Sequence, residues 1–127
     1  AASAVSVYIL VKIFGLGHQH YVTLLPKSIT TAIGMGISEE AGGIVTLTVI
    51  SIIITGVVGS IIAEAVFHVL KITHPVAKGL ALGTSAHAVG TSKALELGEV
   101  EGAMSSLSIA VAGLMTVILV PVISGLI

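Results

Sequence analysis

The sequence predicts an all-α, polytopic membrane domain, and three features of the chain lead to that fold class. Only 9% of the 127 residues are charged and 55% are hydrophobic, whereas about a quarter of the residues in a soluble domain are charged. Several apolar runs approach the roughly 20 residues that a helix needs to cross a bilayer. The longest runs do not alternate polar with apolar residues, as barrel strands would. Inside hydrocarbon, a helix is then the structure that satisfies the backbone.

About five membrane segments follow one another, and two of them are broken or polar. The first is apolar but short, so we expect residues 1–127 to be one membrane domain and the C-terminal part of a longer protein whose N-terminal helices are missing. The second contains Gly34 and Gly36, the third and fifth are uninterrupted apolar spans, and the fourth carries many Ser and Thr residues. In order, the segments are residues 1–16, 25–38, 44–63, 76–95 and 103–127.

An internal repeat relates the second and fourth segments at an offset of 56 residues. Residues 31–34 (TAIG) align with residues 87–90 (HAVG), and Glu40 aligns with Glu96. Each unit contains a polar segment interrupted by glycine, an acidic turn and then an apolar span. Paired, interrupted segments at corresponding positions are typical of the binding site of a transporter. We therefore expect the two polar segments to meet near the middle of the membrane.

The two polar segments can be placed in two ways: they cross the membrane, or they enter and return on the same side. If both cross, most lysines lie at one set of segment ends and most glutamates at the opposite set. Because an excess of lysine marks the cytoplasmic side, crossing is the favoured arrangement. The short segment 25–38 argues against it, since about 14 helical residues reach only about 21 Å.

His87 is the residue most suited to accept a proton. Gly79, Gly83 and His87 are spaced four apart, so they share a helix face along which a neighbouring helix can approach closely. A histidine changes charge near neutral pH, and ionisable residues inside a membrane mark functional sites. We therefore predict that His87 and Glu96 take part in proton coupling. The alternative is a histidine that only donates a hydrogen bond to a neighbouring helix.

Hydroxyls, glycines and one lysine of the polar segments form the predicted site for a small carboxylate. A broken helix exposes backbone N–H groups at the N-terminus of its second half, where an anion is stabilised. The ammonium of Lys93 would attract the carboxylate; alternatively, it snorkels to the interface or pairs with Glu96. Single hydroxyls can instead bond to carbonyl groups of their own helix. The predicted substrate-binding residues are Thr30, Thr31, Gly34, Thr84, Ser85, His87, Gly90, Thr91 and Lys93.

The composition disfavours several other classes of function. Because the chain has no cysteine, disulfides and thiolate metal sites are excluded. His18 and His20 are too few ligands for a metal site, and the sequence shows no nucleophile–base constellation or phosphate-binding loop. We therefore expect no metal, no cofactor and no enzymatic activity. The sequence also lacks a basic patch with aromatic residues, which would indicate binding of nucleic acid.

Two motifs of this chain resemble the LrgB/CidB family of membrane proteins. One is residues 25–31 (LPKSITT), and the other extends from His74 to Ser106 and includes GTSAHAVGT at residues 83–91. The second motif is long and has little degeneracy. The resemblance covers nearly all of residues 25–113.

The resemblance implies two alternative functions. Plant members of the family resemble glycolate/glycerate translocators of the plastid, and some bacterial pairs are linked to pyruvate uptake, which implies a proton-coupled transporter of small monocarboxylates. The alternative is a holin- or antiholin-like regulator of murein hydrolase export and cell lysis. The implied partners are a small LrgA/CidA-type membrane protein, a carboxylate substrate, the lipid bilayer and, as a homo-oligomer, further copies of the chain. The implied location is the bacterial inner membrane, or the plastid inner envelope in a plant.

Overall fold

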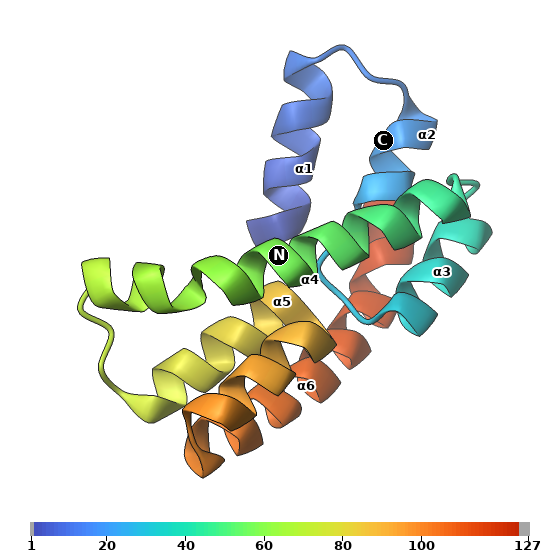
Figure 1. Cartoon of the computed structure of the whole chain (residues 1–127). Helices are drawn as coiled ribbons and strands as arrows, with labels where there is room; N and C mark the ends of the chain where they lie inside the picture. Colours follow the sequence, from blue (N-terminus) through green and yellow to red (C-terminus); the bar gives the residue numbers. More distant parts are fainter. Residues whose placement is uncertain (1, 125–127) are drawn as a thin grey trace.

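The computed structural model describes residues 2–124, and this part of the chain folds into six α-helices without a strand (Figure 1). The all-α class is therefore confirmed. The helices are α1 (Ala2–Ile13), α2 (His18–Leu24), α3 (Thr31–Glu40), α4 (Val45–Val69), α5 (Pro75–Leu97) and α6 (Glu99–Ser124).

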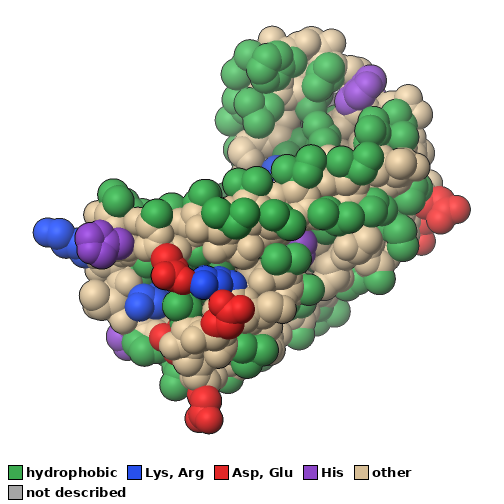
Figure 2. Space-filling model, viewed as in Figure 1, with side chains coloured by type: hydrophobic (Ala, Val, Ile, Leu, Met, Phe, Trp, Pro, Cys, Tyr) green, Lys and Arg blue, Asp and Glu red, His purple; other side chains and the backbone are tan. Residues whose placement is uncertain are grey.

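Two of the described helices, α4 and α6, are long and apolar enough to cross a membrane. The most apolar part of each has a mean hydropathy of 2.4, and only 17% of it is buried within the structure. Apolar side chains lie exposed along α4 (Figure 2). Ile54 and Ile61 are among the exposed residues of this helix. An exposed apolar surface of this extent requires lipid or protein to cover it.

The expectation of about five membrane segments is wrong in number for residues 2–124. Helices α1 and α3 have 12 and 10 residues, and a helix of 12 residues is only about 18 Å long. The hydrocarbon core of a bilayer is about 30 Å thick. Helix α5 has 23 residues but does not run straight.

Helix α5 is a hairpin, because its backbone reverses at His87. This residue has φ 42° and ψ −127°, which lies outside the helical region. The returning half lies close against the outgoing half: a Cβ at Gly90 would contact the carbonyl oxygen of Leu82 and the Cβ of Ala86. Segment 76–95 therefore folds back on itself, and the favoured arrangement, a helix that crosses from one side to the other, is wrong for it.

Helices α2 and α3 form a similar hairpin around the turn at residues 25–30 (Figure 1). On the returning half, a Cβ at Gly34 would lie 3.6 Å from the carbonyl oxygen of Pro26 in the turn. Crossing is therefore also wrong for the second predicted segment. We call residues 18–40 the first hairpin and α5 the second hairpin.

A buried hydroxyl cluster ties the open end of the first hairpin to the start of α4. Thr48 Oγ1 lies 2.8 Å from the carbonyl oxygen of Thr23 and 2.7 Å from Ser38 Oγ, so it contacts both halves of the hairpin. Thr23 Oγ1 accepts a hydrogen bond of 2.8 Å from the backbone N–H of Ile44, just before α4 begins. Because Thr48 is fully buried, water cannot replace these bonds.

Replacing Thr48 by Val should destabilise the protein by about 1–3 kcal/mol, because the partners of the hydroxyl stay buried without their bond. Denaturant titration of the purified protein in detergent measures this change in the free energy of unfolding. Thr46→Val, at an exposed position of the same helix, is the matched control and should change stability by less than about 0.5 kcal/mol. Equal effects of the two substitutions would contradict the role assigned to the cluster.

The two hairpins approach the middle of α4 from opposite ends. The open end of the first hairpin lies at Thr48, near the start of α4. The open end of the second lies at Glu64, near the end of α4, where Glu64 pairs with Lys93. Helix α6 begins at the open end of the second hairpin, and its later residue Val120 packs with Tyr21 of the first. Helices α4 and α6 therefore run in opposite directions.

The repeat seen in the sequence has a counterpart in this arrangement. The offset of 56 residues places Thr31, where α3 begins, on His87, where the second hairpin reverses. Each unit is a hairpin followed by a long apolar helix, and the second unit is inverted relative to the first. Interrupted helices and inverted units are features of several transporter folds.

Two clusters of buried apolar side chains hold the hairpins in place. The first joins α1, the first hairpin and the end of α6, and the second joins the end of α4 to both halves of the second hairpin. The buried members are Val7, Val11, Tyr21, Val22, Leu25, Ile37 and Val120 in the first cluster, and Ala63, Phe67, Leu82 and Ala94 in the second.

Candidate functional site

The two hairpins meet at Ile52, in the middle of α4. His87, at the tip of the second hairpin, donates a hydrogen bond of 3.0 Å from Nε2 to the carbonyl oxygen of Ile52. The residue is only 4% exposed, and its ring packs over Gly56, where a Cβ would lie 2.7 Å from Cε1. On the first hairpin, Gly34 packs against the side chain of Ile52. A Cβ at Gly56 would meet the ring of His87, whereas a Cβ at Gly34 would meet the terminal methyl of Ile52, which can move aside.

Thr91 fixes the tip of the second hairpin to α6. Its hydroxyl donates to the carbonyl oxygen of His87 at 3.0 Å, and its Oγ1 lies 2.7 Å from Ser105 Oγ. Since Thr91 has a single hydroxyl hydrogen, Ser105 is left to donate to Thr91. Gly90, which precedes Thr91, allows the two halves of the hairpin to close. These three predicted site residues (His87, Gly90 and Thr91) thus lie together and make contacts within the protein.

A cavity of about 1120 Å³ lies beside the meeting point, between the tip of the first hairpin, the start of α1, and α4, α5 and α6. Both polar segments contribute to it, residues 25–29 from the first and residues 80–82, 84 and 85 from the second. Most of its walls are apolar. The polar side chains that line it are Ser3, Lys27, Ser28, Thr55, Thr84, Ser85, Ser108 and Thr116.

The predicted site residues divide between this cavity and other places. Among the described residues that line the cavity, Thr84 and Ser85 are the only ones from the predicted substrate-binding set. Thr30 caps α3 from an extended conformation without a side-chain bond to the helix, and Thr31 begins that helix. Both follow Ile29, which lines the cavity.

The hydroxyls of Thr84 and Ser85 are already used as donors. Thr84 donates to the carbonyl oxygen of Leu80 at 2.7 Å, and Ser85 donates to that of Ala81 at 2.6 Å. This is the backbone bonding that the sequence left open as an alternative for single hydroxyls. In this arrangement both hydroxyls can accept a hydrogen bond from a ligand but cannot donate one.

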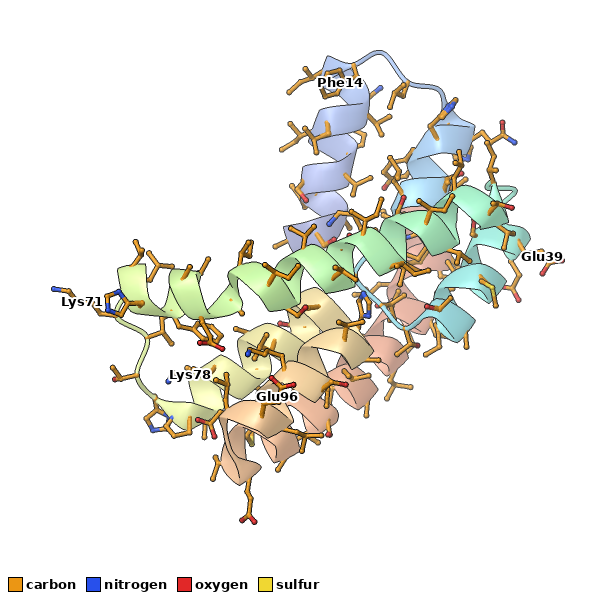
Figure 3. All side chains as sticks on the ribbon, in the orientation of Figure 1. Phe14, Glu39, Lys71, Lys78 and Glu96 are labelled. Atoms are coloured by element: carbon orange, nitrogen blue, oxygen red, sulfur yellow. The ribbon has the colours of Figure 1, made fainter. Side chains whose placement is uncertain are left out.

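Lys93 lies at the open end of the second hairpin. Its ammonium pairs with Glu64 of α4 and, at 3.2 Å, with Glu96 on its own helix. The predicted separation of lysines from glutamates is wrong. Lys78 and Glu96 gather at one end of the molecule and Glu39 lies at the other (Figure 3), because α5 turns back instead of crossing.

Lys27 is a site residue that was not predicted from the sequence, although it belongs to the motif at residues 25–31. Lys27 lines the cavity, and its Nζ lies 3.3 Å from Ser28 Oγ. The available signal was a lysine next to Pro26 inside an apolar segment, since an ionisable residue at membrane depth is a candidate for function. Among residues 2–124, no three His or Glu side chains come together as metal ligands.

Comparisons with known proteins identify a matching family and several similar sequences. A family model described as the LrgB-like family matches residues 1–126. Proteins named Antiholin-like protein LrgB from Bacillus mycoides (strain KBAB4), Bacillus cereus (strain B4264) and Bacillus anthracis (strain CDC 684 / NRRL 3495) are similar to it. They are 41%, 40% and 40% identical over 119 residues, which are 94% of this chain and 52% of each relative. The chain thus spans about half the length of these curated relatives, and no solved structure matches it.

Proposed function

Because this chain belongs to the LrgB-like family, we propose that it acts as part of an antiholin-like protein of the bacterial inner membrane, which restrains murein hydrolase export and cell lysis. The observation that carries this proposal is the shared name of the relatives that are about 40% identical over nearly the whole chain. The exposed apolar faces of α4 and α6 support a place within the membrane. Those faces also offer surfaces for an LrgA/CidA-type partner and for further copies of the protein.

Deleting the gene for the full-length protein from a bacterium that carries it tests this function. Murein hydrolase activity in the culture medium and the rate of lysis should rise, and the intact gene on a plasmid should reverse both effects. The same deletion in a strain without the LrgA/CidA-type partner should have a smaller effect. Unchanged hydrolase activity and lysis in the deletion strain would contradict the proposal.

A second candidate function, transport of small monocarboxylates, is favoured by a specific observation of the geometry. Two inverted hairpins meet at Ile52 beside a cavity to which both contribute. In several transporter folds, substrates bind near the membrane midplane where interrupted helices of inverted units meet. Proton coupling through His87 and Glu96 belongs to this candidate. Buried packing of His87 against Gly56 means that proton transfer there would require the hairpin tip to move.

Uptake of labelled glycolate, glycerate and pyruvate into proteoliposomes tests the second candidate. The purified full-length protein should take up at least one of these acids, faster with an inward proton gradient, both with and without the partner protein. Dissipating the gradient should remove the acceleration. Absence of uptake of all three acids under both conditions would contradict transport and would leave the antiholin-like function to be judged on lysis alone.

A further inference from the structure

We propose that Lys27 is the anion-binding residue of the cavity and that the ligand is a singly charged carboxylate with an apolar tail. The proposal deepens the second candidate function, transport, by naming the residue and the ligand. It starts from one feature of the cavity wall. Lys27 is a half-buried cation on a surface that is otherwise apolar or hydroxyl-bearing.

No carboxylate of the described residues balances the charge of Lys27. The ion pairs within residues 2–124 belong to Lys93, and the lining of the cavity includes no glutamate. The ammonium contacts Ser28 Oγ at 3.3 Å, and Ser28 Oγ in turn lies 3.0 Å from Ser3 Oγ. An ammonium has three N–H donors, so donors remain for a ligand. A charge that is withdrawn from water is stabilised by an opposite charge, and here a bound anion would supply it.

The other candidate donors are less suited to bind an anion. Thr84 and Ser85 donate their hydroxyl hydrogens to carbonyl groups of their own helix. Lys93 is already balanced by Glu64 and Glu96. Binding of an anion therefore depends on the tip of the first hairpin, where Lys27 lies.

The charge and lining of the cavity define the class of ligand. A single lysine compensates a single carboxylate, whereas a second carboxylate would lie against apolar walls without a counter-charge. The cavity is open on one side and measures about 1120 Å³, so it admits an acid of several carbons as well as a two-carbon acid. Its apolar lining includes Ile54, Val58, Met115 and Leu119. An acyl chain of several carbons would bury itself against these side chains.

Calorimetric titration of the purified full-length protein in detergent tests the proposal with butyrate, hexanoate, succinate and the neutral analogue hexanamide. Hexanoate should bind more tightly than butyrate, and succinate and hexanamide should bind at least about tenfold more weakly than hexanoate. Lys27→Gln should weaken hexanoate binding about tenfold or more, and Lys27→Arg should retain most of it. Lys71→Gln, at an exposed position outside the cavity, is the matched control and should bind as the parent does.

Several results would overturn the proposal. They are hexanoate binding to Lys27→Gln as tight as to the parent, equal binding of hexanoate and hexanamide, or no binding of hexanoate to the parent. The experiment separates this proposal from transport. Lys27-dependent binding without uptake of any acid contradicts transport alone, whereas uptake that persists unchanged in Lys27→Gln, with unchanged binding, contradicts the assignment of Lys27 alone.

Discussion

Gly83→Ala should destabilise the protein more than the replacement of any other described helical glycine by alanine. A Cβ at Gly83 would overlap Ser108 Oγ and the backbone carbonyl oxygen of Ser105. The backbone of α6 cannot move aside without separating from the second hairpin, which packs along it. Extra atoms in a packed interior cost about 1–3 kcal/mol, and contact with backbone places this site at the upper end. The free energy of unfolding of the purified full-length protein in detergent measures the effect.

Gly36→Ala is the matched control for this prediction. A Cβ at Gly36 would meet nothing within 4 Å, and alanine is about 1 kcal/mol better than glycine inside a helix. This variant should therefore be as stable as the parent or more stable. If Gly83→Ala were as stable as Gly36→Ala, the close packing of α5 on α6 would be wrong.

His87→Ala should destabilise the protein by about 2–4 kcal/mol, because it removes both the hydrogen bond to Ile52 and the ring that fills the space over Gly56. The same buried contacts argue that His87 holds the hairpin tip in place. This is the structural alternative that the sequence left open. Proton coupling remains a prediction, and the pH dependence of uptake by the folded variants tests it separately.

His87→Gly should be more stable than His87→Ala, although glycine makes fewer contacts. His87 has φ 42° and ψ −127°, a conformation that costs a residue with a Cβ about 1–3 kcal/mol and costs glycine little. The comparison of unfolding free energies therefore isolates the strain of the turn. A glycine variant less stable than the alanine variant would contradict the sharp reversal at this residue.

The fold class and the two long apolar helices were predictable from the sequence, because composition and the length of an apolar run are local properties. The existence of an interruption in each polar segment was also predictable, but its position was not. Gly34 and Gly36 lie inside the unbroken helix α3, and His87, expected on one helix face with Gly83, is the residue at which α5 reverses. Gly34 and Gly90 mark the returning halves of the two hairpins, and the offset of 56 residues relates Thr31 to His87. Glycine and polar residues at matching positions carry that signal without any knowledge of the structure.

The direction of the polar segments was not predictable from the same patterns. A segment of spanning length, residues 76–95, reads as a crossing helix unless the reversal at one residue is known. That reversal rests on contacts distant in the sequence, such as the bond from His87 to Ile52. The predicted separation of lysines from glutamates was wrong for the same reason, the reversal of α5. Lys78 and Glu96 lie at one end only because α5 returns (Figure 3).

Only some of the predicted site residues line the cavity, and which ones do so depends on side-chain geometry that the sequence does not contain. Thr91 bonds to Ser105 on α6, whereas Thr84, one helical face away, lines the cavity. Lys93 is paired with Glu64, which lies 29 positions earlier in the chain (93 minus 64). Lys27 lines the cavity because the first hairpin lies beside α4, and this position depends on contacts between residues distant in the sequence, such as the bond from Thr48 to Thr23.

Labelling of single cysteines by a membrane-impermeant maleimide, added to one side of sealed vesicles at a time, tests the inverted hairpins most directly. The chain has no cysteine of its own, so Glu39→Cys, Lys71→Cys and Glu96→Cys can be introduced into a full-length protein in which any cysteine outside this chain is replaced. The inverted hairpins predict that the cysteines at positions 71 and 96 are labelled from the same side and the cysteine at position 39 from the opposite side. Labelling at positions 71 and 96 from opposite sides would show that α5 crosses the membrane and would contradict the account.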